Sequence, residues 1–253
     1  MATPANSEVK PVFPSFHLLC MEERFSDAFN QAVKTKWPEL PQRIKVTIHD
    51  GRLGALDPEI RFDAVVSPAN SYARLDGGFD DALARAYRPD EDYYWITKRA
   101  QKTLYEKWKG FAPPGTCTVI PLDSEDGQPI QHPWGTKYLL LCPTMAVPCD
   151  VQWDREIVYE CIWSMLCAVD QHNRRSEDGQ QESEIKSILM TPLATGVGRL
   201  RAARWAEQTV IALRHWTEAV EQPNLWSHLQ WDDIYVKQDE LEKTFVDDIP
   251  GPV

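Results

Sequence analysis

The sequence predicts a single α/β/α sandwich, in which helices cover both faces of a largely parallel β-sheet. Short apolar runs alternate with longer segments whose apolar residues recur at helical spacing, which is typical of this class. No internal repeat and no break in composition divides the 253 residues. A chain of this length can bury a substantial core as one domain.

Six short apolar segments are the expected strands of this sheet. They span residues 16–20, 44–48, 62–66, 116–122, 138–142 and 185–190. Strands that alternate with helices tend to pair in parallel and to be buried on both faces. We therefore expect the intervening helices to lie on the two sides of one sheet.

Five segments are expected to be helical: residues 21–37, 80–87, 92–108, 153–169 and 202–219. The first places Phe25, Phe29 and Val33 one turn apart and is stopped by Pro38. The second ends at Pro89.

The domain is expected to span residues 15–235, between a loose proline-containing leader (1–14) and a C-terminal tail (236–253). Residues 173–184 form a polar, charged insertion and are the segment most suited to disorder. Residues 222–235 keep several aromatic side chains, so this part is expected to pack on the body of the domain. Residues 247–253 are expected to be loose.

Composition excludes several classes of function. The formal net charge of −11 argues against broad nucleic-acid binding. No apolar run approaches the roughly 20 residues of a membrane span, and the N-terminus lacks the apolar core of a signal peptide. The six cysteines form no C-x-x-C pair and no zinc-finger spacing, which predicts reduced thiols in a cytoplasmic or nuclear protein, without a metal site or cofactor.

The segment 62–80, F-D-A-V-V-S-P-A-N-S-Y-A-R-L-D-G-G-F-D, is the first candidate binding loop. A strand, a loop with Gly77-Gly78 and a helix start near Asp80 form the arrangement with which α/β folds hold anionic ligands. Asn70 and Asp80 bracket the loop. Each also has a purely structural interpretation, as an Asx-turn residue and as a carboxylate that stabilises a helix N-terminus.

The second candidate loop is the segment 191–199, T-P-L-A-T-G-V-G-R, which also follows a strand and precedes a helix. Thr195, Gly196 and Gly198 offer a hydroxyl and closely approaching amides to a diphosphate. The segment is neither a Walker loop nor a Rossmann fingerprint. A simple tight turn is the alternative.

The order of these segments resembles the macrodomain family. Residues 70–80, N-S-Y-A-R-L-D-G-G-F-D, resemble the branch pattern N-S-aromatic-G-x-M-D-G-G-x-D, with Ala73 for Gly and Leu75 for Met. Residues 138–148 resemble its P-T-M-x-V-P segment, and residues 191–199 resemble its second ligand loop. The resemblance covers roughly residues 16–219. Against the wider family, Ser67 replaces the first Asn, the glycine run is shorter, and Arg199-Leu200 replaces an aromatic residue.

The resemblance implies an α/β/α sandwich with a mixed sheet that binds ADP-ribose or a related nucleotide, with an ADP-ribosylated protein as a further partner. It implies that Asp80 orients or activates a water, with Asp76 and Asp81 as rivals, and that Asn70 contacts the distal ribose. The implied ligand-binding residues are Asp50, Ser67, Ala69, Asn70, Gly77, Gly78, Phe79, Thr195, Gly196, Val197, Gly198 and Arg199.

Three functions stay open at this point. The first is a hydrolase acting on an ADP-ribosyl ester, an acyl-ADP-ribose or ADP-ribose phosphate. The second is a non-catalytic ADP-ribose or nucleotide-binding module, which the shortened glycine run and Ser67 favour. The third is a structural or assembly role.

Overall fold

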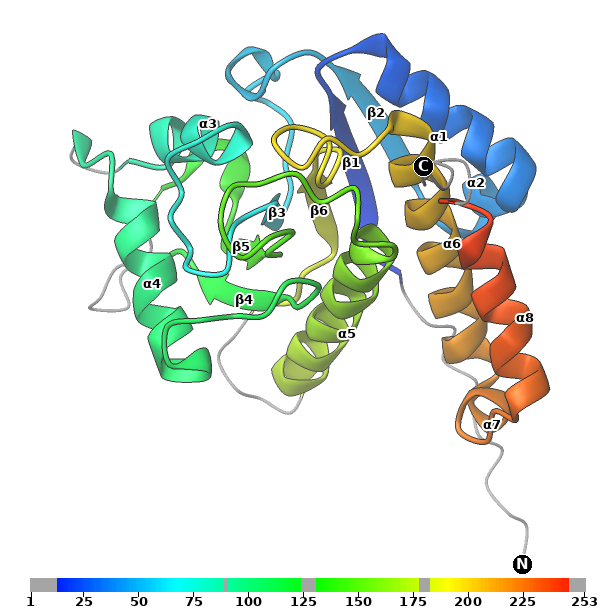
Figure 1. Cartoon of the computed structure of the whole chain (residues 1–253). Helices are drawn as coiled ribbons and strands as arrows, with labels where there is room; N and C mark the ends of the chain where they lie inside the picture. The colour runs from blue at the N-terminus through cyan, green and yellow to red at the C-terminus, as the bar shows by residue number, and fades with distance from the viewer. Residues whose placement is uncertain (1–12, 89–90, 124–130, 178–182, 246–253) are drawn as a thin grey trace, which may run out of the picture.

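The computed structural model describes residues 13–88, 91–123, 131–177 and 183–245 (Figure 1). Their strands form one six-stranded sheet of order β2-β1-β6-β3-β5-β4. The strands are β1 (Ser15–Cys20), β2 (Val46–Asp50), β3 (Ala64–Ser67), β4 (Thr118–Pro121), β5 (Tyr138–Leu141) and β6 (Ser187–Met190). All neighbours pair in parallel except β4 and β5. The predicted mixed, mostly parallel sheet is confirmed.

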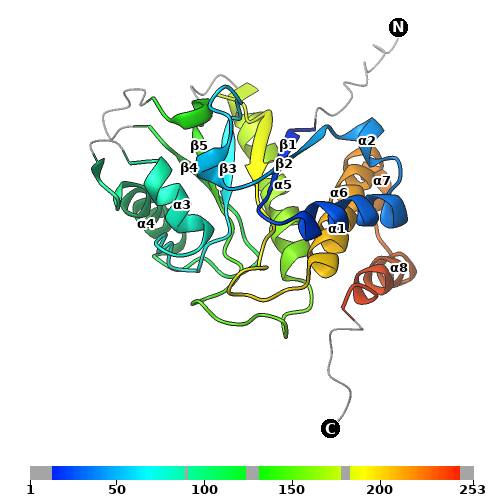
Figure 2. The same cartoon turned by 90° about the horizontal axis from the view of Figure 1, so that it is seen from above.

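Helices cover both faces of this sheet, which makes three layers (Figures 1 and 2). One face carries α1 (Glu23–Lys36), α5 (Ile157–Glu177) and α6 (Ala202–Glu221), and the other carries α3 (Phe79–Ala86) and α4 (Trp95–Trp108). The short helices are α2 (Leu40–Arg43), α7 (Pro223–Trp226) and the 3-10 turns η1 (Leu53–Ala55) and η3 (Pro133–Gly135). The last helix, α8 (Trp231–Glu242), lies beside α6.

The core consists of two apolar clusters, one on each side of the sheet. In β3, Ala64 and Val66 belong to the cluster under α1, α5 and α6, whereas Val65 belongs to the cluster under α3 and α4. This alternation follows from the two-residue period of a strand. Because β3 is covered on both faces, its sequence is apolar throughout rather than alternating.

The polar segment expected as an insertion at residues 173–184 begins within a helix. α5 continues to Glu177, and Asn173 makes two hydrogen bonds with the start of the β6 segment. Its Nδ2 donates to the Ile185 carbonyl (3.0 Å), and its Oδ1 accepts from the Ile185 amide (2.8 Å). The expected start of the insertion was therefore wrong, and residues 178–182 lie outside the described part of the chain.

The expected domain end at residue 235 was also wrong, because it falls inside α8. Leu241 and Phe245, beyond that boundary, are each only 3% exposed. Arg214 of α6 also pairs with Glu240, and Lys237 pairs with Glu218. The packed domain therefore extends at least to Phe245. Residues 246–253, like residues 1–12 of the expected leader, lie outside the described residues.

Candidate functional site at the carboxyl edge of the sheet

The carboxyl ends of β1, β6 and β3 meet at one edge of the sheet, where the direction of the chain connections changes. From β1 the chain turns outward to β2, and from β3 it turns the other way, past the position of β5, to β4 at the opposite edge; β6 lies between β1 and β3. Ligands of open α/β sheets bind outside the carboxyl ends of the strands at such a point. Figure 1 shows the loop after β6 between α3 and α1 at this edge.

A buried serine–aspartate pair occupies this edge. Ser67 is the last residue of β3, and its hydroxyl donates a hydrogen bond of 2.7 Å to Oδ1 of Asp80, the second residue of α3. The Asp80 residue is only 6% exposed. Burial raises the pKa of Asp80 to about 7, although the bond from Ser67 opposes this shift; the nearby charge of Asp76 adds to it.

The two rival carboxylates are placed differently. Asp76 is exposed and accepts a hydrogen bond of 2.5 Å from Nε of Arg74. Asp81 accepts from Nε of Arg85 (2.9 Å) and from the Tyr93 hydroxyl (2.6 Å), and these two bonds lower the pKa of Asp81. Of the three, Asp80 alone is buried, and its pKa is raised toward the range that suits a general base.

Asn70 is engaged by its own loop. Its Oδ1 accepts from the amides of Tyr72 (3.1 Å) and Arg74 (3.3 Å), and its Nδ2 donates to the Arg74 carbonyl (2.8 Å). This is the Asx-turn arrangement that the sequence allowed. Ala73, which stands where the similar family branch has Gly, has a left-handed φ of 53° within this turn. The ribose contact of Asn70 stays a prediction.

The start of α3 presents backbone donors beside Asp80. Gly78 precedes the helix with a left-handed φ of 58°, and the Gly77 carbonyl accepts from the Asp80 amide (3.1 Å). Within the described residues, the amides of Gly78 and Phe79 donate no hydrogen bond to the protein. They are free to receive an anion. Ala69, by contrast, is buried, and its carbonyl accepts from the Thr144 amide (2.9 Å).

The loop after β6 is closed by a backbone hydrogen bond, and two amides at its described tip donate to no protein atom. Ala194 and Arg199 both adopt left-handed φ values, 59° and 60°. The Leu200 amide closes the loop on the Ala194 carbonyl at 3.0 Å. In the described part of the chain, the amides of Gly196 and Val197 at the exposed tip donate no bond to protein atoms. The tip can therefore accept an anionic group.

The remaining members of this loop have structural roles. The Thr195 hydroxyl donates to the Pro192 carbonyl (3.0 Å), so it faces its own turn. A Cβ on Gly198 would lie 2.5 Å from the Ala194 carbonyl oxygen, so any side chain there would force the loop to shift. The Arg199 guanidinium lies 3.9 Å from an Asp150 carboxylate oxygen and is otherwise largely exposed.

Sequence reasoning missed the segment that holds this loop in place. Residues 150–152, between β5 and α5, dock on it: the Val151 amide donates to the Gly198 carbonyl (3.1 Å), and Gln152 Nε2 donates to the Arg199 carbonyl (2.8 Å). These are contacts to backbone atoms between segments nearly 50 residues apart. No local sequence pattern marks such contacts.

Asp50 lies on the same edge but away from the serine–aspartate pair. It is exposed at the end of β2, and β1 and β6 separate that strand from β3. Three strand spacings correspond to about 14 Å. Asp50 can therefore reach only the far end of a ligand bound at Asp80.

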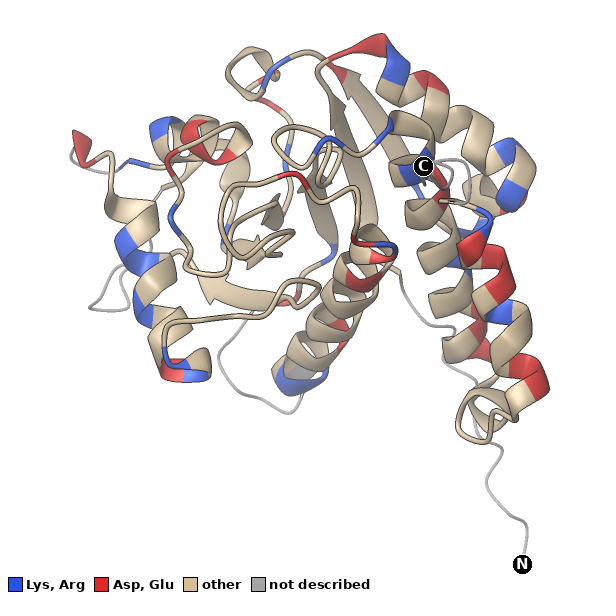
Figure 3. Ribbon diagram, viewed as in Figure 1, with Lys and Arg blue, Asp and Glu red and all other residues tan. Residues whose placement is uncertain are grey.

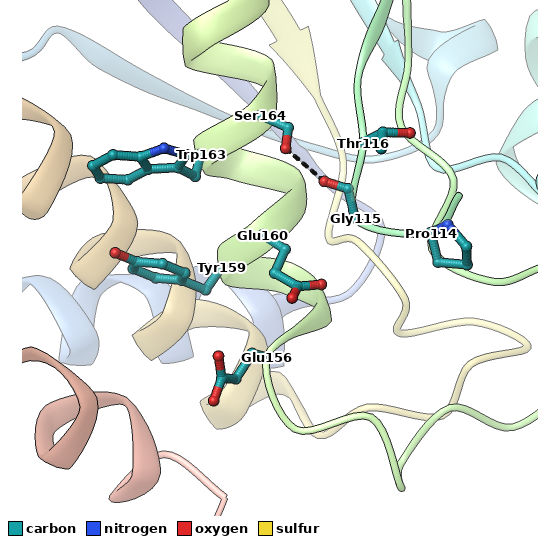
Figure 4. Close-up of a pocket in the computed structure, with 8 residues that line it drawn as sticks. All are labelled: Pro114, Gly115, Thr116, Glu156, Tyr159, Glu160, Trp163 and Ser164. Carbon is teal, nitrogen blue, oxygen red and sulfur yellow. Dashed lines mark hydrogen bonds between the residues drawn. The ribbon is translucent and has the colours of Figure 1, made fainter. Parts of the chain in front are cut away.

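Two surface cavities of the described residues lie elsewhere. One, of about 430 Å³, runs along the outer face of α5 and is lined by Pro114, Gly115, Thr116, Glu156, Tyr159, Glu160, Trp163 and Ser164 (Figure 4). Ser164 donates to the Gly115 carbonyl across it (2.6 Å). The other, of about 780 Å³, lies on α1 and the residues that follow it. Neither cavity includes a candidate catalytic or ligand-binding residue from the sequence.

Charges are distributed unevenly over the molecule. Lys and Arg mark α4, whereas Asp and Glu mark α8 and the start of α3 (Figure 3). Within the described ranges, no group of three or more His, Cys, Asp or Glu is arranged to hold a metal ion. Among the described helices, none has the length and hydropathy needed to cross a bilayer.

No protein-family model and no curated protein matches this chain. Solved structures similar to it include three of a macrodomain from Oceanobacillus iheyensis, each 16% identical in sequence. A mutant of that protein with ADPR gives a TM-score of 0.42 and aligns over 60% of this chain and 71% of that one. The form with MES bound (TM-score 0.42) and a second mutant (0.43) both align over 76% of this chain and 89% of theirs.

These three solved structures are macrodomains, the family that the loop motifs of this chain resemble. A likeness of this size names neither a ligand nor a reaction for this chain. Its function has to be argued from its own residues.

Proposed function

We propose that this protein binds ADP-ribose or a related nucleoside diphosphate at the carboxyl edge of its sheet. The observation that carries the proposal is the buried carboxyl of Asp80, bonded to Ser67, directly beside the unused amides of Gly78 and Phe79. Amides at a helix start and in a glycine loop favour phosphate groups. The unused amides of the loop after β6 supply a second set of donors from the neighbouring strand.

A hydrolytic reaction is the chemistry that Asp80 supports. A carboxyl whose pKa is raised to about 7 is partly ionised at neutral pH, so it can accept a proton from water. The deprotonated water would then attack an ADP-ribosyl ester or ADP-ribose phosphate held by the two loops. Ser67 would keep the carboxyl oriented during this step.

One observation favours binding without catalysis as the second candidate. The side-chain amide of Asn70 makes its hydrogen bonds within its own loop, so the residue implied to contact the distal ribose is already engaged. Without that contact, the reacting end of the ligand would be held less firmly. Positioning of this kind contributes a large share of enzymatic rate enhancement.

Binding is tested by thermal unfolding with ADP-ribose, AMP and ribose 5-phosphate. A ligand at 100 times its Kd stabilises by about 2.7 kcal/mol. Each kcal/mol raises the Tm of a domain near this size by about 2–4 °C. We expect a shift of several degrees with ADP-ribose and little with the two fragments. No shift with any of the three would contradict the proposal.

Catalysis is tested by the variant Asp80→Ala, with Asp81→Ala as the matched control. Loss of a general base lowers turnover by about 10²–10⁴-fold. We expect turnover of an ADP-ribosyl ester to fall by this amount in Asp80→Ala, with affinity for ADP-ribose nearly unchanged. Asp81 is engaged by Arg85 and Tyr93, so its variant should retain activity. A wild-type protein that binds but does not turn over any ester or phosphate establishes the binding module instead.

A further inference from the structure

Two cysteines face each other at the end of the antiparallel pair β4–β5. The ladder joins Thr118 to Leu141, and the next residues outward are Cys117 and Cys142. Both side chains pack in the apolar cluster under α1, α5 and α6. Both sulfur atoms are reduced. The fold has therefore placed two thiols opposite each other, on one face of the sheet, from positions 25 residues apart in the sequence.

The pairing type of this position suits a disulfide. The Leu122 amide donates to the Lys137 carbonyl (2.9 Å), which identifies these opposed residues as a hydrogen-bonded pair. Pair types alternate along an antiparallel ladder, so Cys117 and Cys142, five steps on, form a pair of the non-hydrogen-bonded type. Such pairs bring Cα atoms to about 4.5 Å. Disulfides span Cα separations of about 4.4–6.8 Å.

The two thiols differ in access. Cys117 is half-buried, whereas Cys142 is fully buried in the core. The neighbouring Cys117 thiol and burial both raise the pKa of Cys142, so Cys142 is mostly protonated before exchange begins. Cys117 is therefore the thiol that an oxidant reaches first, and Cys142 is positioned to resolve the product.

We propose that Cys117 and Cys142 form a reversible cross-strand disulfide by exchange with a small-molecule disulfide. The Cys117 sulfur, deprotonated, attacks one sulfur of the reagent, and the other half leaves as a thiol after taking up a proton. Cys142 then loses its proton and attacks the Cys117 sulfur of the mixed disulfide, which releases the second half as a thiol. Two S–H bonds are lost, one protein S–S bond forms, and the reagent is reduced to two thiols.

The site lies next to the serine–aspartate pair. The Cys142 amide donates to the Ser67 carbonyl (2.9 Å), and the Ser67 hydroxyl bonds Asp80. The competing thiol on this side is Cys161, which is fully buried and whose sulfur donates to the Pro143 carbonyl at 3.5 Å. The inference concerns thiol chemistry and stands independently of the proposed function.

The test is incubation of the reduced full-length chain with glutathione disulfide, followed by alkylation and peptide mapping without reduction. The wild type is expected to lose the thiols of Cys117 and Cys142 and to yield one peptide pair that links them. Cys142→Ala should stop at a glutathione adduct on Cys117. The control Cys149→Ser, which removes an exposed thiol, should form the same linked pair as wild type.

Two results would overturn the proposal. One is a stable glutathione adduct on Cys117 of the wild type with no linked peptides. The other is a link from either cysteine to Cys161 in place of the link between them. The wild-type chain alone decides both, so the result does not depend on whether the variants fold.

Discussion

Burial of the Asp80 carboxyl disfavours its ionised form, which costs stability, and the same burial raises its pKa toward the range that suits catalysis. An ionised carboxylate without a cation partner is costly to bury, and the structure offers it one hydroxyl, from Ser67. A helix N-terminus favours the charge, but by less than burial disfavours it, since the pKa is raised to about 7. Groups perturbed in this way concentrate at functional sites.

The substitution Asp80→Asn should stabilise the protein above pH 7. Because the pKa is raised from 3.8 in the unfolded chain to about 7 in the folded one, stability is lost as pH rises through this window. Asn resembles the protonated carboxyl and avoids the loss. The gain should be on the order of a few kcal/mol, measured by urea unfolding.

The gain should vanish at a pH below 3.8, where the carboxyl is protonated in both states. Asp81→Asn is the control with the opposite sign. Its pKa is lowered by Arg85 and Tyr93, so the change should not stabilise at any pH. An Asp80→Asn protein that is less stable than wild type across the whole range would show that the charge is well compensated.

Ser67→Ala should raise the pKa of Asp80 further. The Ser67 hydroxyl donates to the ionised carboxylate, and this bond is what opposes burial. Carbon-13 NMR titration of the Asp80 carboxyl reads the change directly. Ser67→Thr keeps a hydroxyl and should restore part of the shift. An unchanged pKa in Ser67→Ala would mean that the bond is not made in solution.

At the scale of elements, the two glycines of the loop after β6 serve different purposes. Gly198→Ala should destabilise by about 1–3 kcal/mol, because the new Cβ would lie 2.5 Å from the Ala194 carbonyl oxygen and 2.8 Å from Val151. Gly196→Ala meets nothing within 4 Å and should stay within about 0.5 kcal/mol of wild type. Chemical denaturation compares the two. Equal losses would contradict the docked position of residues 150–152.

A pair of histidines links β1 to its neighbour β2, the outermost strand on that side of the sheet. His17 Nδ1 lies 2.9 Å from His49 Nε2, and the rings are 10° from parallel. Burial, then His49 and Lys45, lower the pKa of His17; burial also lowers that of His49, against the charge of Asp50. A hydrogen bond between the two nitrogen atoms uses one proton. If both rings were protonated, their positive charges would repel each other.

Stability should therefore fall as pH decreases below 6.5, the ordinary histidine pKa. Near and below that pH the unfolded chain binds more protons than the folded one. His49→Gln should reduce this slope in pH-dependent urea unfolding without abolishing it, because burial also lowers the pKa of His132 and of His215. His228→Gln, at an exposed position, should leave the slope as in wild type. A slope that is unchanged in His49→Gln would assign the pH dependence to the other groups.

At the scale of the whole molecule, α8 completes the domain rather than trailing from it. Leu241→Ala should destabilise by about 2–5 kcal/mol, because that side chain is buried at 3% exposure. Val236→Ala, on the same helix at 61% exposure, should change stability by less than about 0.5 kcal/mol. The Tm values of the two variants, each compared with wild type, test this difference. Equally small effects of both would mean that the packed domain ends near residue 235, as the sequence predicted.

Much of the fold could be predicted because burial leaves a local pattern. Strands covered on both faces are apolar throughout, as in β3 and β5, and helices such as α1 repeat their apolar residues every turn. The two candidate loops were also visible, since glycines and a following helix stand next to one another in the chain. The end of α8 was missed because two buried residues, Leu241 and Phe245, stand among charged ones.

The sequence by itself determined the order of strands and helices, the two loops at the carboxyl edge and the candidate carboxylates. Only the tertiary structure decided which carboxylate is buried, because Asp76, Asp80 and Asp81 are chemically alike until packing removes water from one of them. It likewise decided that Ser67 bonds Asp80 and that Cys117 lies opposite Cys142. Burial and strand register depend on segments distant in the chain, and these are the terms that local patterns do not contain.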